Sequence, residues 1–215
     1  MNDFSVGMAL FDYLPVIFFG IGGVILLRDL YNKMSKGAFA IFAAGVIDVF
    51  MAGFLKATWK LLYAGANIDI SAFNAMFFPV QSIGFLLAGI GIIAMLCHNQ
   101  KEKGVKNCAV VPVVPIVPEV SITFPYLVLV MVAGLGCLDA GLCILAKKMK
   151  KPAVIAIFAL SFVCCLGMGY LSTKDFEEAA MNWIAEGVNF CGQGLFLLGT
   201  WMLHKAGLAD LELDK

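Results

Sequence analysis

The chain alternates between long apolar runs and short polar stretches, and this pattern is the clearest signal in its 215 residues. A helix needs about 20 mostly apolar residues to cross the hydrocarbon core of a bilayer. The windows that reach this length predict about six transmembrane helices, at residues 11–31, 38–59, 73–96, 124–145, 152–172 and 180–203. The sequence therefore predicts an all-α polytopic membrane protein.

Aromatic residues and prolines support these limits. Every Trp and Tyr falls near an end of a predicted helix, as expected at a membrane interface, where the ring is in apolar surroundings and its polar atom stays hydrated. Pro125 and Pro152 fall at helix starts, where a missing N–H costs nothing. Pro79 lies well inside a predicted helix, so we expect that helix to kink or loosen near Asn74–Ala75.

The second half of the chain repeats several short motifs of the first half in the same order. Ala-Ile-Phe-Ala occurs at 40–43 and at 156–159, each time just after a Lys-Met-x-Lys turn. We predict two three-helix repeats, residues 1–104 and 124–215, the second ending in a short polar tail. Such repeats are common in membrane transporters, where the solute site lies between the halves. In architecture alone, this arrangement resembles the small sugar carriers with parallel triple-helix repeats, whose specific motifs are not identified here.

A proline-rich extended linker, residues 105–123, joins the predicted repeats. Its prolines at 112, 115 and 118 recur with the period of a polyproline II helix and exclude an ordinary spanning helix. If the linker stays on one side of the membrane, the basic residues divide almost evenly between the two sides. If it crosses, sheathed by helices, all of them except Lys56, Lys60 and Lys174 fall on one side, as the positive-inside rule favours. The sequence leaves both topologies open, together with a weakly fixed orientation.

Composition fits the membrane class, since 61% of residues are hydrophobic and only 14% are charged. The net charge of zero gives no support to a nucleic-acid partner. The cysteines have no metal-binding or redox spacing, and no nucleophile elbow, phosphate loop or HExxH motif occurs. We therefore predict no metal and no cofactor and favour a non-enzymatic role. The compact chain favours a bacterial inner membrane, and a homo-oligomer stays open.

The last predicted helix carries a polar stripe. Its residues are spaced four, three and four apart, which places them on one helix face: Asn182, Glu186, Asn189 and Gln193. A carboxyl group at that depth costs several kcal/mol if it faces lipid, so it must face the bundle interior or water. The stripe predicts a lined pathway for a solute or a proton. The alternative is that these side chains only hydrogen-bond the helices together.

The third predicted helix carries a thinner version of this stripe. The positions 108 residues before the four stripe residues hold two amides and two aromatic rings. The amides are Asn74 and Gln81, and the rings are Phe78 and Phe85. If the two halves meet, they form a site with a polar wall and an aromatic wall, suited to a small amphiphilic or cationic solute. The alternative is that the two phenylalanines face lipid.

Two more acids fall inside predicted helices, Asp48 in 38–59 and Asp139 in 124–145. A carboxyl group without a partner in a membrane tends to be protonated, because burial disfavours the charged form. Such a group suits proton coupling, in which an acid must load and release a proton. The alternative for each acid is a neutral, structural carboxyl group bonded to nearby backbone.

These features predict a small transporter or channel for a small polar or amphiphilic solute. A more specific version of this prediction is that transport is coupled to protons through Glu186 and Asp48. The expected partners are the lipid bilayer and the solute. The alternative is a non-transporting membrane sensor, assembly factor or subunit of a membrane complex, which would turn its polar face outward. An enzyme acting on lipid would need a second polar centre near Glu186, which Asp48 could supply only if the second and sixth predicted helices touch.

Overall fold

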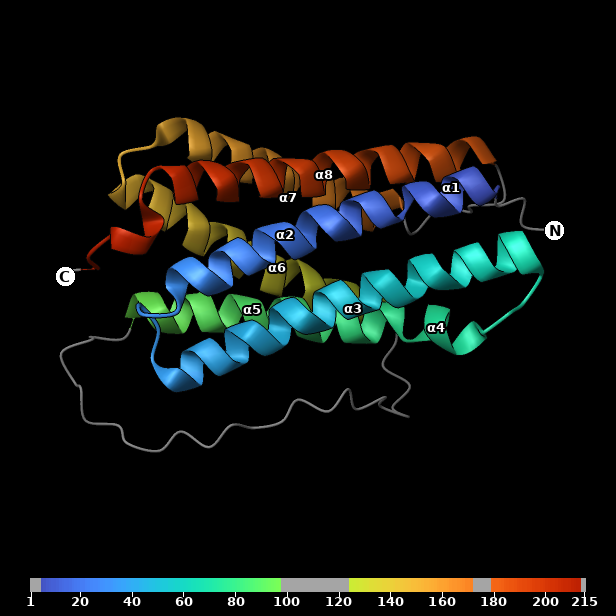
Figure 1. The fold of residues 1–215 in the computed structure, drawn as a ribbon, viewed down its shortest axis with the longest axis horizontal. Helices are drawn as coiled ribbons and strands as arrows, with labels where there is room; N and C mark the ends of the chain where they lie inside the picture. The colour runs from blue at the N-terminus through green and yellow to red at the C-terminus, as the bar shows by residue number, and fades with distance from the viewer. Residues whose placement is uncertain (1–4, 98–123, 172–178, 214–215) are drawn as a thin grey trace.

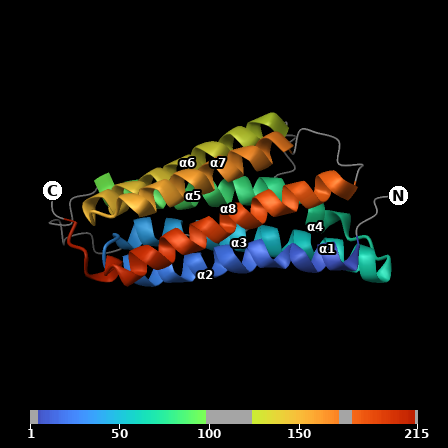
Figure 2. The same cartoon turned by 90° about the horizontal axis from the view of Figure 1, so that it is seen from above.

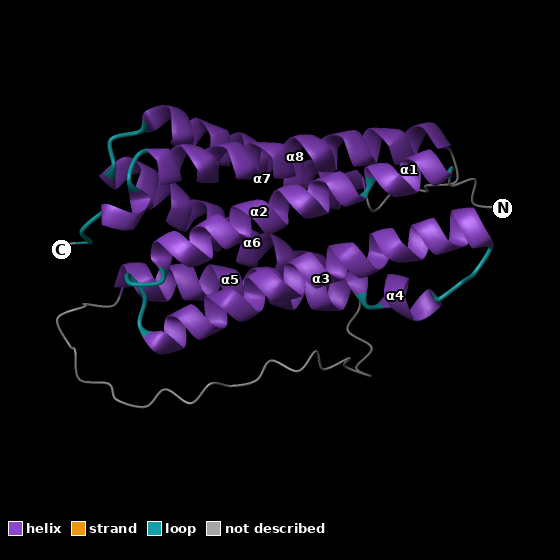
Figure 3. Ribbon diagram, in the orientation of Figure 1, coloured by secondary structure: helices purple, strands orange, loops and turns teal. Residues whose placement is uncertain are grey.

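The computed structural model describes residues 5–97, 124–171 and 179–213. Within these ranges the chain forms helices joined by turns and contains no strand (Figure 3). The elements are α1 (Val6–Phe11), α2 (Tyr13–Leu30), α3 (Lys36–Ala66), α4 (Ser71–Ala75), α5 (Phe77–Cys97), α6 (Phe124–Lys148), α7 (Pro152–Leu171), α8 (Ala179–Lys205) and the short 3-10 helix η1 (Leu208–Asp210).

The helices have the length and composition of membrane spans. Four helical stretches are long and apolar enough to cross a bilayer: Val6–Leu30, Lys36–Ala66, Ser71–Cys97 and Tyr126–Lys148. The helices α7 and α8 are two further apolar helices. The prediction of an all-helical membrane protein is confirmed at this level.

Two of the helical stretches are interrupted, and each interruption lies three residues before a proline. The break between α4 and α5 falls at Met76, next to the position predicted from Pro79. The break between α1 and α2 falls at Asp12 and precedes Pro15. A proline inside a helix removes one backbone hydrogen bond and its ring crowds the preceding turn, which accounts for both breaks. The second break was not predicted, because the helix begins at Val6 and not at the predicted residue 11.

The helices pack in a ring in the order α2, α3, α5, α6, α7 and α8, and α8 closes the ring against α2 (Figures 1 and 2). Contacts between α5 and α6 advance along both helices together: the Ser82 hydroxyl donates to the Leu127 carbonyl at 2.9 Å, and Ile92 lies against Gly141 farther on. These two neighbours are therefore parallel. Consequently Cys97 and Phe124 lie at opposite ends of the bundle; the linker 105–123 that joins them is outside the described residues.

Glycines allow close approach of the backbones at several helix contacts. A Cβ atom on Gly134 would overlap the backbone of Leu86, and one on Gly45 would overlap the backbone of Ala88. A Cβ on Gly91 would lie 2.6 Å from the Cβ of Phe42. Small residues of this kind let membrane helices gain van der Waals contact without a hydrophobic driving force between them.

One end of the bundle is strongly basic, and we call it the basic end. It holds every Lys and Arg of the described residues except Lys56 and Lys60: Arg28, Lys33, Lys36, Lys147, Lys148, Lys150, Lys151 and Lys205. The C-terminal tail is fastened there, because Lys33 Nζ donates to the Leu211 carbonyl at 2.5 Å. The end of α8 is held against α2, where His204 Nδ1 lies 2.8 Å from Asp29 Oδ2. Burial lowers the pKa of Lys33, and the nearby acids Asp210, Asp29 and Glu212 oppose that shift.

Candidate solute cavity

A cavity of about 300 Å³ lies inside the ring, in the half of the bundle away from the basic end. It receives side chains from α2, α3, α5, α6, α7 and α8, so every long helix contributes to its wall. Most of the lining is apolar. A mostly apolar cleft with a few placed polar groups is the usual form of a small-molecule site.

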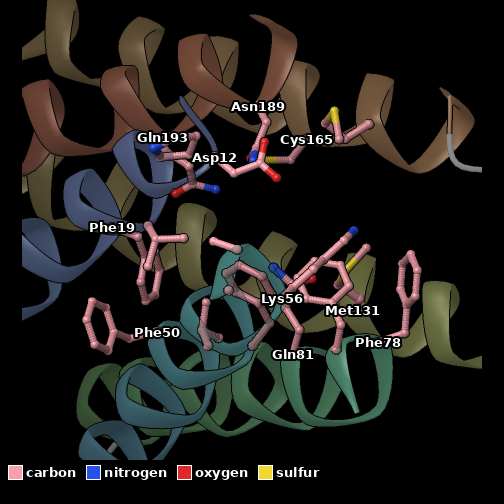
Figure 4. A pocket seen from close by; sticks show the side chains of 18 of the residues that line it. Asp12, Phe19, Phe50, Lys56, Phe78, Gln81, Met131, Cys165, Asn189 and Gln193 are labelled. Atoms are coloured by element: carbon pink, nitrogen blue, oxygen red, sulfur yellow. The ribbon is translucent and has the colours of Figure 1, made fainter. Parts of the chain in front are cut away.

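The polar groups of the cavity lie on two facing walls. One wall carries Asp12, at the break between α1 and α2, with the α8 side chains Glu186, Asn189 and Gln193. The other wall carries Lys56 from α3 with Gln81 and Phe78 from α5. Figure 4 shows Asp12, Asn189 and Gln193 across the open space from Lys56, Gln81 and Phe78.

A buried ionic trio joins the first wall to α3. Lys60 Nζ lies 2.5 Å from Asp12 Oδ2 and 2.7 Å from Glu186 Oε1. All three side chains are nearly inaccessible, with 5% of Lys60, 7% of Asp12 and 9% of Glu186 exposed. One ammonium between two carboxylates leaves the trio with one excess negative charge when both acids are ionised. Removing Lys60 would leave two buried carboxylates without a cation, whereas removing one acid leaves a neutral pair, so Lys60 is the member on which the other two depend.

The other lysine of the cavity, Lys56, lies one helical turn before Lys60 on the same face of α3. Its Nζ lies 3.8 Å from the centroid of the Phe77 ring and 5.6 Å from that of Phe78, an arrangement typical of cation–π contacts. Within the described residues it has no carboxylate within salt-bridge distance. The ammonium therefore keeps its hydrogen-bond donors available to the cavity.

Three phenylalanine rings form a layer between the cavity and the basic end. The Phe19 ring stacks on Phe196 at 5.3 Å and meets the edge of Phe85 at 5.8 Å. The exposed fractions of Phe19, Phe85 and Phe196 are 3%, 3% and 4%, so this aromatic layer closes the cavity on that side. Beyond it, fully buried side chains fill the bundle: Leu26, Phe42, Ile92, Leu142 and Leu203.

The structure brings most of the predicted site residues together. The cavity is lined by five of them, together with Phe85 from the predicted aromatic wall: Glu186, Asn189, Gln193, Gln81 and Phe78. Asn182 lies one turn before Glu186 on α8 and is half-buried outside the lining. Asn74 lies exposed on α4, also outside the lining.

Neither predicted helix acid lies in the cavity. Asp48 is buried where α3 meets α5, with its Cβ close to Gly84. Asp139 is buried on α6, and neither of its carboxylate oxygens has a hydrogen-bond partner within the described residues. Asp48 does not line the cavity, so it does not supply a second polar centre beside Glu186.

Asp12, Lys56 and Lys60 were not predicted as site residues. The second helix was predicted to end at residue 59, which placed Lys60 at the membrane surface, whereas α3 continues to Ala66. Asp12 fell inside the predicted helix 11–31 without an assigned role, whereas a preceding turn of helix carries it into the bundle. Two lysines four residues apart on one face of an otherwise apolar helix were the available signal.

The chain matches no protein-family model, no curated protein and no solved structure. The geometry of the cavity therefore carries the functional argument.

Proposed function

We propose that the protein is a small membrane transporter or channel for a small polar or amphiphilic solute, and that all six long helices span the membrane. The observation that carries this proposal is the cavity inside the ring, to which every long helix contributes and into which charged and amide groups point. Three residues of the polar stripe of α8, Glu186, Asn189 and Gln193, face this cavity. A sensor, assembly factor or complex subunit would be expected to present such a stripe on its outer surface, so the inward direction favours transport.

The interrupted helices support the same proposal. Both breaks, at Asp12 and at Met76, lie in the half of the bundle that holds the cavity, and residues beside each break line it. Broken helices at the level of the solute are a recurring feature of secondary transporters, because they supply polar groups and points of movement.

The cavity has a candidate gate on each side. The aromatic layer separates it from the basic end, whereas the ionic trio ties α3 to α8 and to the start of α2 on the other side. Opening one gate while the other stays closed would expose the solute to one side of the membrane at a time.

The positive-inside rule places the basic end in the cytoplasm. Because α5 and α6 run parallel, the linker 105–123 then joins the two sides of the membrane. The two three-helix units, α2–α5 and α6–α8, would consequently have the same orientation, as parallel repeats require.

Proton coupling in this proposal runs through Asp12 and Glu186. Two carboxylates held by one ammonium can accept a proton while Lys60 keeps an ionised partner. Asp12 Oδ1 is buried without a hydrogen-bond partner among the described residues, so the trio has an oxygen free to bind a proton.

The test of transport is a variant that fills the cavity. In proteoliposomes, flux of a labelled C4 panel (butyramide, butyrate and butylammonium) is compared between the native protein, Gln193→Trp and Leu198→Trp. Gln193 lines the cavity, whereas Leu198 lies on the same helix outside the cavity lining, with 46% of its surface exposed. We expect Gln193→Trp to reduce the flux of at least one probe at least tenfold and Leu198→Trp to leave it unchanged. Equal flux of every probe in all three proteins contradicts transport through the cavity.

The test of coupling is Glu186→Gln, which keeps an amide oxygen near Lys60 but binds no proton. We expect folding to survive, because Asp12 still neutralises Lys60, and we expect the dependence of flux on pH to be lost. Uptake that keeps its pH dependence in this variant would exclude Glu186 as a coupling group.

A further inference from the structure

The charges around the cavity constrain the solute that it can hold. The titratable groups that face it are Asp12 at the α1–α2 break, Lys56 on α3, Cys165 on α7 and Glu186 on α8, and Lys60 lies behind the two acids. The described parts of α5 and α6 add no titratable group to the lining. With both acids ionised, the two lysines balance them, and the empty cavity is neutral overall.

The distribution of this charge is uneven. Lys60 is fully engaged by the two carboxylates, whereas Lys56 faces the cavity with a ring as its close contact. An ammonium in such surroundings has donors but no acceptor, and burying a charge without hydrogen bonds is costly. A solute carboxylate would supply two acceptor oxygens at that point.

Apart from Gln81, the wall near Lys56 is apolar. Phe77, Phe78 and Met131 lie beside it (Figure 4). The cavity volume of about 300 Å³ gives room for roughly ten water-sized groups. A short hydrocarbon tail or a single ring attached to a carboxylate fits this combination of volume and surface.

The aromatic wall does not suit a cationic solute. A solute cation stacked on the Phe77 or Phe78 ring would lie beside the Lys56 ammonium, and the two like charges would repel. The cationic class expected from the sequence is therefore disfavoured by the lysine that the structure places on that wall.

We propose that the cavity binds a small amphiphilic monocarboxylate, with its carboxylate on the Lys56 ammonium and its apolar part against Phe77, Phe78 and Met131. The solute class rests on the proposed transport function and narrows it. One anion entering the neutral cavity leaves one excess negative charge in a low-dielectric site. One proton bound by the Asp12–Glu186 pair removes that charge, so one carboxylate and one proton enter together and no net charge moves.

Binding of hexanoate to the full-length protein in nanodiscs tests this solute class. Titration calorimetry compares hexanoate with hexanamide and hexylammonium, which share its tail but are neutral and cationic. The variants are Lys56→Gln, Lys56→Arg and Lys148→Gln, the last an exposed lysine at the basic end. Empty nanodiscs and the Gln193→Trp variant are the controls that measure how much of each probe partitions into lipid.

We expect hexanoate to bind at least tenfold more tightly than either analogue. Lys56→Gln should weaken that binding at least tenfold, Lys56→Arg should retain most of it, and Lys148→Gln should leave it unchanged. Loss of hexanoate binding in Lys56→Gln, together with its retention in Lys56→Arg, would show an effect of charge and not of misfolding. Tighter binding of hexylammonium or hexanamide, or binding indifferent to Lys56, would overturn the solute class.

These outcomes are distinct from a failure of transport. If Gln193→Trp blocks the flux of another C4 probe while hexanoate does not bind, the solute class is wrong and the transport proposal stands. If no probe shows flux that is sensitive to Gln193→Trp, transport itself is contradicted.

Proton uptake gives a second readout. Binding of one anion with one proton strengthens as pH falls, by up to about tenfold per pH unit, because each bound proton contributes one factor of the proton concentration. Calorimetry in buffers of different ionisation enthalpy should show about one proton taken up per hexanoate in the native protein. It should show none in the Asp12→Asn, Glu186→Gln double variant. Anion binding without proton uptake in the native protein would contradict the coupled step.

Discussion

The two halves of this bundle are stabilised in different ways. Between the aromatic layer and the basic end, which we call the packed half, the helices are continuous, glycines permit close backbone contact and large side chains such as Phe42 and Leu142 are fully buried. The other half, the cavity half, contains both helix breaks, open volume and the buried trio of Asp12, Lys60 and Glu186.

This difference suggests a division of roles. The packed half depends on many small contacts and should hold the ring together, whereas the cavity half depends on a few strong ionic contacts that can be rearranged. Ion pairs that can break and reform suit a gate better than interlocked side chains, which resist gradual deformation.

The largest expected effect comes from breaking the trio at its centre. Lys60→Met leaves two carboxylates buried without a cation, and we expect it to lower the free energy of unfolding by about 3–5 kcal/mol. The comparison variant is Lys147→Met, an exposed lysine at the end of α6, with an expected change within about 0.5 kcal/mol. Steric trapping in micelles measures both values.

A rescue sharpens this prediction. Adding Asp12→Asn and Glu186→Gln to Lys60→Met removes all three charges and should restore most of the lost stability, because the neutral set no longer holds an unpaired charge. A triple variant as unstable as Lys60→Met would show that the cavity half depends on packing around Lys60 and not on the ion pairs.

A somewhat smaller effect is expected in the packed half from Gly91→Ala. The added methyl would lie 2.6 Å from the Phe42 Cβ, and Phe42 is fully buried. Overpacking of this kind should cost about 1–3 kcal/mol. Gly187→Ala on α8 is the matched control, since nothing lies within 4 Å of its added methyl, and it should be neutral or slightly stabilising. Equal losses in the two variants would mean that close glycine contacts do not distinguish the halves.

The smallest effect is expected at Asp139, where the buried carboxyl group has no hydrogen-bond partner within the described residues. Replacing an unpaired polar group by an apolar one removes its desolvation cost, so Asp139→Val should raise the free energy of unfolding by about 1 kcal/mol. A clear loss of stability, measured in the same way, would mean that Asp139 is engaged in a bond that stabilises the bundle.

The helices could be predicted from the sequence more fully than the site. Apolar length located α6, α7 and α8 to within about three residues, because membrane thickness fixes how long a spanning helix must be. Helical spacing likewise placed Glu186, Asn189 and Gln193 on one face, and the structure turns that face to the cavity.

The ion pairs could not be predicted in the same way. The hydropathy window of the second helix ended before Lys60, and the window that began at residue 11 gave no reason to single out Asp12. Both residues are in the helical bundle, where they neutralise each other. Their pairing depends on contacts between α2, α3 and α8, and nothing in the local sequence specifies which helices meet. For the same reason the sequence could not show that Asp48 lies outside the cavity, where its face of α3 packs on α5.

The most direct test of the central claim, a hydrated pathway in the cavity half, is the accessibility of single cysteines on α8 in an otherwise cysteine-free chain. A membrane-impermeant, water-soluble thiol reagent is applied to Asn189→Cys and Gln193→Cys, which line the cavity, and to Ala185→Cys and Leu203→Cys, which are buried. We predict labelling of the first pair and not of the second. If all four positions stay unlabelled, the stripe is dry and serves only to join helices, and transport through this cavity is contradicted.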